Sequence, residues 1–427
     1  MKRYKMEALI QWKNSPDPLP LIIRGARQVG KTWLMKEFGA TQFESVAYIN
    51  FDNNQRMETL FEGSYHIPRL IAGLEIEADV EIVPGKTLII FDEIQEVPKA
   101  ISSLKYFREN APEYFIVAAG SLLGVALHPG TSFPVGKVDF IDLHPLSYLE
   151  FLEAMGEQKL VKLLNSKDWT LINAFRQNYT DLLRQYYFVG GMPEVVSAFA
   201  QGQNYTQVRK VQHRLLSAYQ EDFSKHAPNE VVPRIRMLWD SIPAQLAKEN
   251  KKFVYGNVKP GARAKDFEMA MQWLLDCGVI YKVNRVTKPG MPLAAYQDSA
   301  FKLYLLDVGL LGAISDLDVK TLLEGNKIFQ EFKGALTEQY VQQQLVAALG
   351  VRSYYWAAER GNAEVDFIFQ QGGQITPLEV KAEENLKAKS LKVYVEKYAP
   401  QVALRTSMSP YRQEAWLINI PLYAIGV

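Results

Sequence analysis

The sequence predicts an α/β protein that begins with a parallel sheet covered by helices on both faces. It then predicts a helical region and a second α/β region at the C-terminus. Two observations lead to this fold class. Short apolar runs alternate with segments of helical periodicity in the first third of the chain. Near the end, a long helical segment precedes a hairpin of alternating residues at 364–381.

Composition limits what the protein can be. The chain has 427 residues, enough for two to four domains, and 48% of them are apolar. Its 48 Lys and Arg residues nearly balance 47 Asp and Glu residues, so any nucleic-acid contact must come from a local patch. Cys277 is the only cysteine, which excludes an internal disulfide and a cysteine-ligated zinc site.

The first element is a short strand at 19–24, followed by a glycine-rich turn and a helix. The turn reads GARQVGKT, the G-x-x-x-x-G-K-T pattern whose amide groups surround phosphate oxygens. Lys31 is expected to reach the β- and γ-phosphates of a nucleoside triphosphate, and Thr32 to hold Mg²⁺. The expected nucleotide contacts in this segment are Gly25, Ala26, Arg27, Gln28, Val29, Gly30, Lys31, Thr32 and Trp33.

Two acids follow a second buried strand. Residues 88–91 are apolar, and Asp92 and Glu93 come directly after them. Acids at the end of a buried strand are costly unless they meet a cation or water at the edge of the sheet. Asp92 is therefore the expected partner of Mg²⁺, and Glu93 is expected to polarise the water that attacks the γ-phosphate.

Two more strands complete the expected sheet. One lies at 45–52, and the other, at 114–121, ends in Ser121. Ser121 could sense the γ-phosphate, and it could equally cap a following helix. Together these segments predict a P-loop NTPase sheet.

A family resemblance rests on a series of segments. The segments GARQVGKTWLMKEFG, YINFDN, LIIFDEIQ, AAGSLLG and LHPLSYLEF, followed by GGMPEVV, FKLYLLDVGLL and VDFIF…LEVKA, resemble a prokaryotic family of AAA-type ATPases with a C-terminal domain of unknown function. Similar proteins usually carry Gly-Arg before the PLS segment, whereas this chain has Gly136-Lys137. Lysine keeps the charge but loses the bidentate fork of arginine, so the role of this position is open. Arg108 and Lys137 are the candidates for an arginine-finger role.

The middle of the chain changes character twice. Residues 147–228 have helical periodicity, interrupted by a turn at Gly190-Gly191, as in a helical lid. Residues 229–326 read as a helix broken at Pro243, a second helix, and two strands, the order of a winged helix. Basic residues such as Lys251 and Lys252 in this region suggest contact with duplex DNA, and equally suit a linking module with solvated lysines.

The hairpin near the end carries three polar residues among apolar neighbours. Asp366 lies on its first strand, and Glu379 and Lys381 share one face of the second. An amphipathic helix at 333–349 carries Glu338. The order resembles the restriction-endonuclease-like PD-(D/E)xK arrangement, in which Asp366, Glu379 and Glu338 would bind Mg²⁺ and Lys381 would act on water or on phosphate charge. A structural Asp–Lys pair in an inactive fold is the alternative.

The sequence thus predicts four regions: a P-loop ATPase core at 1–146, a helical lid at 147–228, a winged-helix-like domain at 229–326 and a PD-(D/E)xK-like domain at 327–427. The predicted function is that of an ATP- and Mg²⁺-dependent ATPase acting on or near nucleic acid, with Glu93, Lys31, Asp366, Glu379 and Lys381 as catalytic residues. The alternative is a signalling or scaffold ATPase with an inactive C-terminal binding module.

Partners and location follow from the same features. ATP, DNA and further copies of the chain are the expected partners. No membrane contact is expected, because the longest apolar run, at 115–127, is shorter than the ~20 residues that span a bilayer. The N-terminus lacks the apolar stretch of a signal peptide, so a cytoplasmic protein is expected.

Overall fold

The computed structural model describes residues 1–121, 133–248, 251–324, 330–359, 362–384 and 387–427. The chain divides into two compact units. The N-terminal unit comprises Arg3–His144 and Asp276–Gly278, and the C-terminal unit comprises Met1–Lys2, Pro145–Leu275 and Val279–Val427.

The N-terminal unit is built on a parallel five-stranded sheet with strand order β2-β3-β4-β1-β5. Its strands are β1 (Leu21–Arg24), β2 (Ser45–Asn50), β3 (Thr87–Asp92), β4 (Phe115–Ala119) and β5 (Asp139–Asp142). Its helices are α1 (Lys5–Lys13), α2 (Lys31–Gln42), α3 (Gln55–Glu62), α4 (Ile67–Ala78) and α5 (Pro98–Asn110), with a 3-10 turn η1 (Ile94–Glu96) after β3. The predicted parallel α/β sheet is confirmed.

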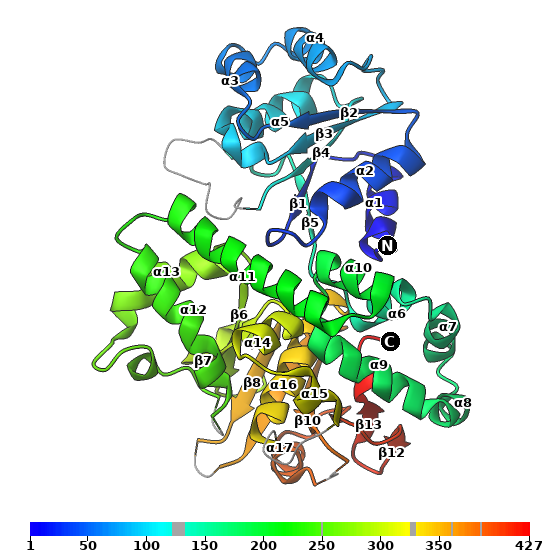
Figure 1. Ribbon diagram of the computed structural model, residues 1–427, viewed down its shortest axis with the longest axis vertical. Coiled ribbons are helices and arrows are strands. Elements are labelled where there is room, and N and C mark those ends of the chain that lie inside the picture. The colour runs from blue at the N-terminus through cyan, green and yellow to red at the C-terminus, as the bar shows by residue number, and fades with distance from the viewer. Residues whose placement is uncertain (122–132, 249–250, 325–329, 360–361, 385–386) are drawn as a thin grey trace. The chain divides into compact units, whose positions relative to one another are not determined.

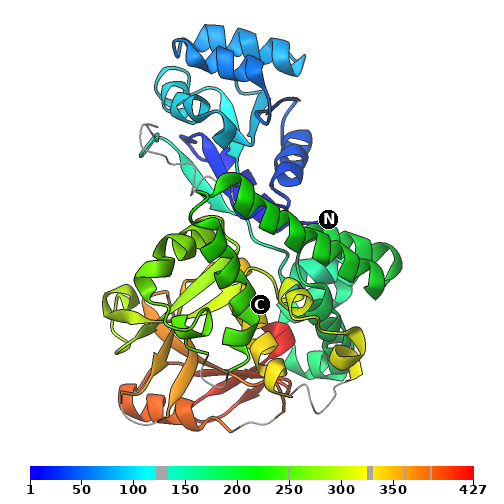
Figure 2. The same cartoon turned by 60° about the vertical axis from the view of Figure 1, so that its left-hand side comes forward.

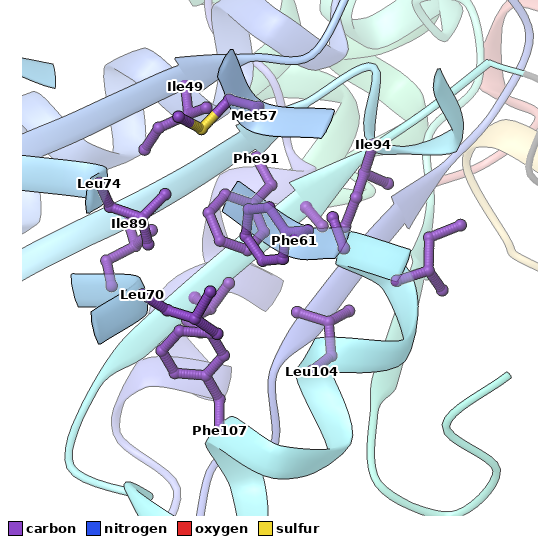
Figure 3. Close-up of a cluster of buried hydrophobic side chains, with 14 of the residues drawn as sticks. Ile49, Met57, Phe61, Leu70, Leu74, Ile89, Phe91, Ile94, Leu104 and Phe107 are labelled. Carbon is purple, nitrogen blue, oxygen red and sulfur yellow. The ribbon is translucent and has the colours of Figure 1, made fainter. Parts of the chain in front are cut away.

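Apolar side chains on both faces of this sheet hold the helices in place. On one face, Phe91 packs with Phe61 and Phe51, inside a core to which α3, α4 and α5 contribute (Figure 3). On the other face, Phe38 of α2 contacts Trp12 of α1, which in turn contacts the ring of Phe115. Every residue of β3 is buried, as its continuous apolar run predicts for a central parallel strand.

The strand order decides which side chains meet. β4 lies between β1 and β3, and all three run in the same direction. The carboxyl ends of parallel strands meet at one edge of the sheet, where helix N-termini also begin. The glycine-rich turn after β1, the acids at the end of β3 and Ser121 after β4 therefore lie at a common edge.

The C-terminal unit begins with helices, as predicted (Figures 1 and 2). They are α6 (Tyr148–Ala154), α7 (Gln158–Ser166), α8 (Trp169–Ala174), α9 (Arg176–Val189), α10 (Pro193–Gly202), α11 (Tyr205–His226), α12 (Val232–Leu246) and α13 (Ala264–Asp276), with η2 (Tyr255–Asn257) between the last two. A capping box joins Ser147 and Glu150 at the start of α6, which explains why the helical region begins there.

A mixed eight-stranded sheet completes the unit, in the order β12-β13-β11-β10-β9-β8-β6-β7. Its strands are β6 (Ile280–Val286), β7 (Gln297–Leu305), β8 (Ser353–Ala357), β9 (Glu364–Gln371), β10 (Gln374–Val380), β11 (Leu404–Ser407), β12 (Arg412–Gln413) and β13 (Ile418–Pro421). The remaining elements are η3 (Leu293–Tyr296), α14 (Val308–Ile314), α15 (Val319–Glu324), α16 (Gln330–Ala347), α17 (Lys389–Tyr398) and η5 (Leu422–Ala424). The predicted hairpin is present as β9 and β10, which pair antiparallel around Gly372 and Gly373.

One sheet joins regions that the sequence assigned to different domains. β6 pairs antiparallel with β7 and parallel with β8, so the strands of the predicted winged helix continue into the C-terminal sheet. The order of two helices and two strands at 232–305 agrees with the predicted order of elements. The winged-helix character and the four-domain division stay predictions.

Two expectations about helices were wrong. The helix predicted to break at Pro243 continues as α12 to Leu246. Pro243 lies in the last turn of α12. The hydrogen bond lost with its missing N–H therefore does not end the helix at that position. The helix at 333–349 was expected to be amphipathic, but Thr337, Gln339 and Gln343 in α16 are as buried as its apolar residues. Its polar side chains are inside because they find hydrogen-bond partners there.

Candidate functional site

The turn between β1 and α2 has a backbone that glycine makes accessible. Gly25 and Gly30 have φ values of 148° and 95°, and Gln28 between them also has a positive φ of 64°. A Cβ atom added to Gly25 would lie 2.2 Å from the carbonyl oxygen of Leu143, so a side chain has no room there. α2 begins at Lys31, which places the positive end of a helix dipole at the turn.

Lys31 is folded into this turn. Its Nζ atom donates hydrogen bonds of 2.9 Å to the carbonyl oxygens of both Gly25 and Ala26. Its exposed fraction is 7%. Burial lowers the pKa of Lys31 to about 8, although the carboxylates of Glu93 and Asp92 partly offset the effect. Within the described residues, its hydrogen bonds go to carbonyl oxygens, so this buried ammonium group is well suited to bind an anion.

The carboxylate of Asp92, the last residue of β3, accepts three hydrogen bonds. Thr32 Oγ1 donates to its Oδ2 atom over 2.7 Å, and Tyr48 OH donates to the same atom over 2.9 Å. The backbone N–H of Glu93 donates to the other oxygen over 3.2 Å. Sequence reasoning placed Thr32 and Asp92 here but missed Tyr48, which lies on β2 and reaches Asp92 through the strand pairing of β2 with β3.

These oxygen atoms fit the Mg²⁺ that a triphosphate site implies. Mg²⁺ prefers hydroxyl and carboxylate oxygens, and Thr32 Oγ1 and Asp92 Oδ2 already lie within 2.7 Å of each other. Thr32 and Asp92 would hold the ion. When bound, it would neutralise charge on the phosphate oxygens.

Glu93 is held by side chains from two other positions. Gln95 Nε2 donates to Glu93 Oε2 over 2.7 Å, and Ser121 Oγ donates to the same oxygen over 3.4 Å. Arg27 Nε in turn donates to Ser121 Oγ over 3.0 Å. The structure therefore brings together Arg27, Glu93 and Ser121, three of the predicted site residues. Gln95 was missed, because a glutamine in a turn after a strand carries no sequence signal of its own.

The remaining residues of the predicted nucleotide site differ in their burial and in their partners. Ala26 and Val29 are buried and help to shape the turn, whereas the Trp33 side chain is 42% exposed. The two candidates for an arginine-finger role are both paired within the unit. Arg108 forms a bidentate contact with Asp17, and Lys137 lies 3.0 Å from Glu109.

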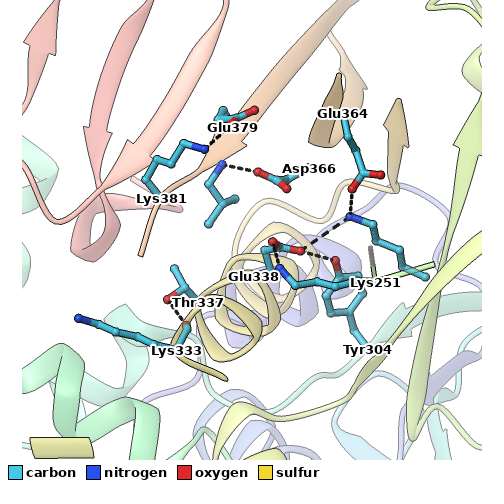
Figure 4. A network of polar contacts seen from close by, with 11 residues as sticks. Lys251, Tyr304, Lys333, Thr337, Glu338, Glu364, Asp366, Glu379 and Lys381 are labelled. Carbon is cyan, nitrogen blue, oxygen red and sulfur yellow. Dashed lines mark hydrogen bonds and ion pairs between the residues drawn. The ribbon is translucent and has the colours of Figure 1, made fainter. Parts of the chain in front are cut away.

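The C-terminal unit contains a second polar cluster, formed around Glu338 of α16 (Figure 4). The ammonium group of Lys251 contacts Glu338 Oε1, and Tyr304 OH donates to Oε2 over 3.2 Å. Lys302 Nζ lies 3.9 Å from Oε2 of Glu338 and 2.6 Å from Oε1 of Glu364. Burial alone would raise the pKa of Glu338, but the ammonium groups of Lys251 and Lys302 lower it below its ordinary value.

The hairpin residues border this cluster. Asp366 Oδ2 accepts a hydrogen bond of 2.7 Å from the backbone N–H of Val380, and Lys381 Nζ donates to Glu379 Oε1 over 2.6 Å. Burial, reinforced by the Glu338 and Glu379 carboxylates, raises the pKa of Asp366 well above its ordinary value. Burial also raises the pKa of Glu379, although Lys381 partly offsets it. The structure thus gathers the predicted C-terminal site residues around one region.

The fit of a divalent cation to this cluster is mixed. Within the described residues, Glu379 Oε2 is buried without a hydrogen-bond partner, so this oxygen could bind a cation. The described residues nevertheless contain no group of three or more His, Cys, Asp or Glu side chains with the spacing of a metal site. Glu338 lies near two lysines, Lys251 and Lys302, whereas Glu379 is paired with Lys381 through one oxygen and keeps the other without a partner, so Asp366 and Glu379 are the better candidates for such an ion.

Three family models match successive parts of the chain. Residues 17–152 match an AAA domain. Residues 180–321 match a domain of unknown function (DUF8612), and residues 333–424 match another domain of unknown function (DUF4143). The AAA match covers the sheet, the turn and the acids described above. The match agrees with the P-loop NTPase fold that the sequence predicts for the N-terminal unit.

Three solved structures resemble the chain at low sequence identity. The Walker-type ATPase PABY2304 of Pyrococcus abyssi is 15% identical, over 74% of this chain and 95% of its own, with a TM-score of 0.45. The Aeropyrum pernix ORC1 protein in complex with DNA is 14% identical, over 74% and 93%, with a TM-score of 0.28. The Thermotoga maritima RuvB Holliday junction branch migration motor is 12% identical, over 67% and 88%, with a TM-score of 0.30. The P-loop assignment therefore rests on the AAA match and the site geometry.

Two further comparisons were negative. No curated protein matches the chain significantly. Among the described residues, no helix is both long enough and apolar enough to cross a membrane.

Proposed function

We propose that the protein is a Mg²⁺-dependent ATPase. One observation carries the proposal: Lys31 and Thr32 from the turn before α2, and Asp92 and Glu93 from the end of β3, converge at the sheet edge, where Thr32 and Asp92 are in direct contact. The match of residues 17–152 to an AAA domain supports the same activity.

Each side chain has a distinct task in hydrolysis. The Lys31 ammonium group exchanges its carbonyl partners for oxygens of the β- and γ-phosphates. Thr32 and Asp92 would hold the metal ion, and Tyr48 fixes the orientation of Asp92. Glu93 orients a water molecule and accepts its proton as the water oxygen bonds to the γ-phosphorus and the bond to ADP breaks. Ser121 and Arg27 lie beside Glu93, where the γ-phosphate is expected.

Two variants test this proposal. Lys31→Ala should lose ATP binding, because the buried cation of the site is gone. Glu93→Gln should bind Mg²⁺-ATP normally but hydrolyse it about 10²–10⁴-fold more slowly, as expected when a general base is removed. Binding is measured by titration with a fluorescent ATP analogue and turnover by phosphate release.

The control is Lys86→Ala, since Lys86 is exposed and its ammonium group pairs with Glu44 at the surface. This variant should behave as the wild type does. Normal hydrolysis by Lys31→Ala would show that the turn before α2 is not the ATP site.

We also propose that the C-terminal cluster acts on the phosphodiester backbone of nucleic acid. Asp366 and Glu379 would hold a divalent cation, with Glu338 beside them and Lys381 next to the scissile phosphate. The unpartnered Glu379 Oε2 supports this role. When bound, the ion would polarise the phosphate and lower the pKa of a coordinated water.

The alternative is a signalling or scaffold ATPase whose C-terminal region binds partners without catalysis. A specific contact favours it. Glu338 is neutralised by Lys251 and lies near Lys302, which is buried, so the cluster already has cations of its own. A buried cluster satisfied in this way can serve to hold α16 against the sheet.

Cleavage of labelled DNA and RNA in Mg²⁺ or Mn²⁺ distinguishes the two. Cleavage by the wild type that disappears in both Asp366→Ala and Glu379→Ala supports the nuclease role. A wild type that neither cleaves nor binds Mn²⁺ at these carboxylates supports the inactive module.

DNA binding by the middle region needs its own test. Lys251 is paired with Glu338, so it is not free for a phosphate, whereas Lys259 and Arg263 are exposed. Salt-dependent DNA binding that is lost on charge reversal at Lys259 and Arg263 would support a DNA partner. Unchanged binding in that double variant would place any contact elsewhere.

A further inference from the structure

Gln95 occupies an unusual place beside the acids of the nucleotide site. It is the middle residue of η1, the 3-10 turn that directly follows Glu93. Glu93 itself adopts a left-handed backbone with φ of 52°, which turns the chain sharply at the end of β3. Gln95 is 7% exposed, so its amide group is removed from solvent. A buried amide normally exists to make specific hydrogen bonds.

The orientation of this amide follows from its neighbours. Its nitrogen donates to Glu93 Oε2 over 2.7 Å and approaches Glu96 Oε1 at 3.3 Å. Both neighbours are carboxylates, which only accept hydrogen bonds. The nitrogen must therefore face them, since the opposite orientation would place the amide oxygen against negative charge. This reasoning fixes which end of Gln95 faces Glu93.

The two donors to Glu93 select one of its oxygens. Gln95 Nε2 and Ser121 Oγ both donate to Oε2, and within the described residues no other side chain donates to this carboxylate. Oε1 is thereby left for a different partner. A carboxylate held at one oxygen loses rotational freedom, so the other oxygen is pre-oriented before the substrate arrives.

The amide oxygen of Gln95 is the second part of the arrangement. Within the described residues it is buried and has no hydrogen-bond partner. A buried acceptor without a donor is costly. Within the same residues, only the nitrogen end of Gln95 makes side-chain hydrogen bonds, so its role at the site depends on that end.

We propose that Gln95 is a positioning residue for ATP hydrolysis. This inference rests on the proposed ATPase function and names a residue that neither the phosphate turn nor the acidic pair reveals. Through its nitrogen, Gln95 holds Glu93 so that Oε1 meets the attacking water. Gln95 does not bind the nucleotide, so it affects turnover and leaves affinity for ATP alone.

The experiment compares Gln95→Leu, Glu93→Gln and the double variant with the wild type. Gln95→Leu should lower kcat about 10- to 100-fold, the range seen when a residue that orients a catalytic group is removed, with KM changed less than about twofold. In the Glu93→Gln background the same substitution should cause almost no further loss, because Gln95 acts through Glu93. Gln55→Leu, at an exposed position on α3, is the matched control and should leave kcat unchanged.

Gln95→Met is a second variant that keeps the length of the side chain, adds no charge beside Glu93 and Glu96, and removes both amide donors. It should show the same separation of kcat from KM. Thermal unfolding confirms that each variant is folded.

Several outcomes would overturn the proposal. A normal kcat in both Gln95 variants, a loss of ATP affinity that accounts for their defect, or losses that multiply in the double variant would each show that Gln95 is structural or irrelevant. The proposed function fails in a different way. If the wild type does not hydrolyse ATP, or if Glu93→Gln hydrolyses it normally, the ATPase proposal is wrong and the Gln95 inference is wrong with it.

Discussion

At the scale of single residues, the proposed nucleotide site contains contacts between side chains that are far apart in the chain. Tyr48 OH donates a hydrogen bond of 2.9 Å to Asp92. The Nζ atom of Lys36 lies over the Tyr48 ring, 3.7 Å from the ring centroid. Burial, together with the nearby Asp92 carboxylate, raises the pKa of Tyr48 above its ordinary value. The hydroxyl therefore keeps its proton and remains a hydrogen-bond donor. Such a contact fixes one oxygen of the carboxylate that is expected to position the metal.

Removal of the Tyr48 hydroxyl should weaken metal binding in particular. Tyr48→Phe keeps the ring but removes one of the two donors to Asp92 Oδ2, so the Mg²⁺ concentration for half-maximal ATP hydrolysis should rise about tenfold. Affinity for ATP in the absence of Mg²⁺ should not change. Tyr114→Phe, which removes a hydroxyl elsewhere in the same unit, serves as the control. An unchanged Mg²⁺ requirement in Tyr48→Phe would show that Asp92 needs no such support.

Lys31 should make ATP affinity depend on pH. Its pKa is about 8 in the free protein because of burial, and the phosphates of ATP favour the charged form, so its pKa rises on binding. Above pH 8 the free protein must take up a proton to bind, and the affinity falls as pH rises. The dissociation constant should be roughly tenfold higher at pH 9 than at pH 7.

Isothermal titration in buffers of different ionisation enthalpy would measure both the affinity and the proton uptake. In Lys31→Arg the guanidinium group stays charged over this range, so any remaining binding should not vary with pH for this reason. A wild-type affinity that is constant from pH 7 to pH 9 would contradict the depressed pKa.

At the scale of secondary-structure elements, α16 organises the C-terminal unit through glutamines. Gln339 accepts a hydrogen bond of 2.8 Å from the backbone N–H of Leu305 and donates one of 2.6 Å to the carbonyl oxygen of the same residue. Gln343 bonds to Val308, Tyr186 and Asp307, and Gln344 accepts from the backbone N–H of Tyr148. One helix thereby satisfies backbone groups of several other elements, which explains why its polar residues are buried.

Truncation of one of these glutamines should destabilise the unit more than a typical surface change. Gln339→Ala leaves both backbone groups of Leu305 without their partner, at a cost of about 2–4 kcal/mol in the free energy of unfolding. Gln207→Ala, at an exposed helical position of α11, should cost less than about 0.5 kcal/mol. Urea unfolding followed by tryptophan fluorescence would measure both. Equal stability of the two variants would show that the Gln339 contacts contribute little.

At the scale of the whole molecule, the two units differ in which parts of the chain build their sheets. The N-terminal unit is nearly one continuous segment, and its parallel sheet and core are complete in themselves. In the C-terminal unit, β6 and β7 share a sheet with strands that follow α16. Because β6 and β7 lie in one sheet with strands from the end of the chain, the folding of the middle of the chain depends on those C-terminal strands.

Fragments of the chain should reflect this difference. A fragment of residues 1–144 should fold cooperatively, because its core is built from its own residues. A fragment of residues 229–326 should not, because β6 would lose β8 and α16 would be missing, leaving an unpaired edge and exposed apolar surface. Near-ultraviolet circular dichroism and thermal unfolding would measure this. A folded 229–326 fragment would support an independent winged-helix domain instead.

The sequence by itself determined the glycine-rich turn after β1, the acids at the end of β3, the parallel sheet and the hairpin at 364–381. These are local patterns, since glycine spacing, apolar runs and alternation act over fewer than about ten residues. Only the tertiary structure decided that Tyr48 meets Asp92, that Gln95 holds Glu93 and that Lys251 and Lys302 surround Glu338. The amphipathic expectation for α16 failed for the same reason, because a polar side chain is buried only where a distant partner satisfies it. Strand order and long-range pairing create those partners, and no local pattern records which residues they bring together.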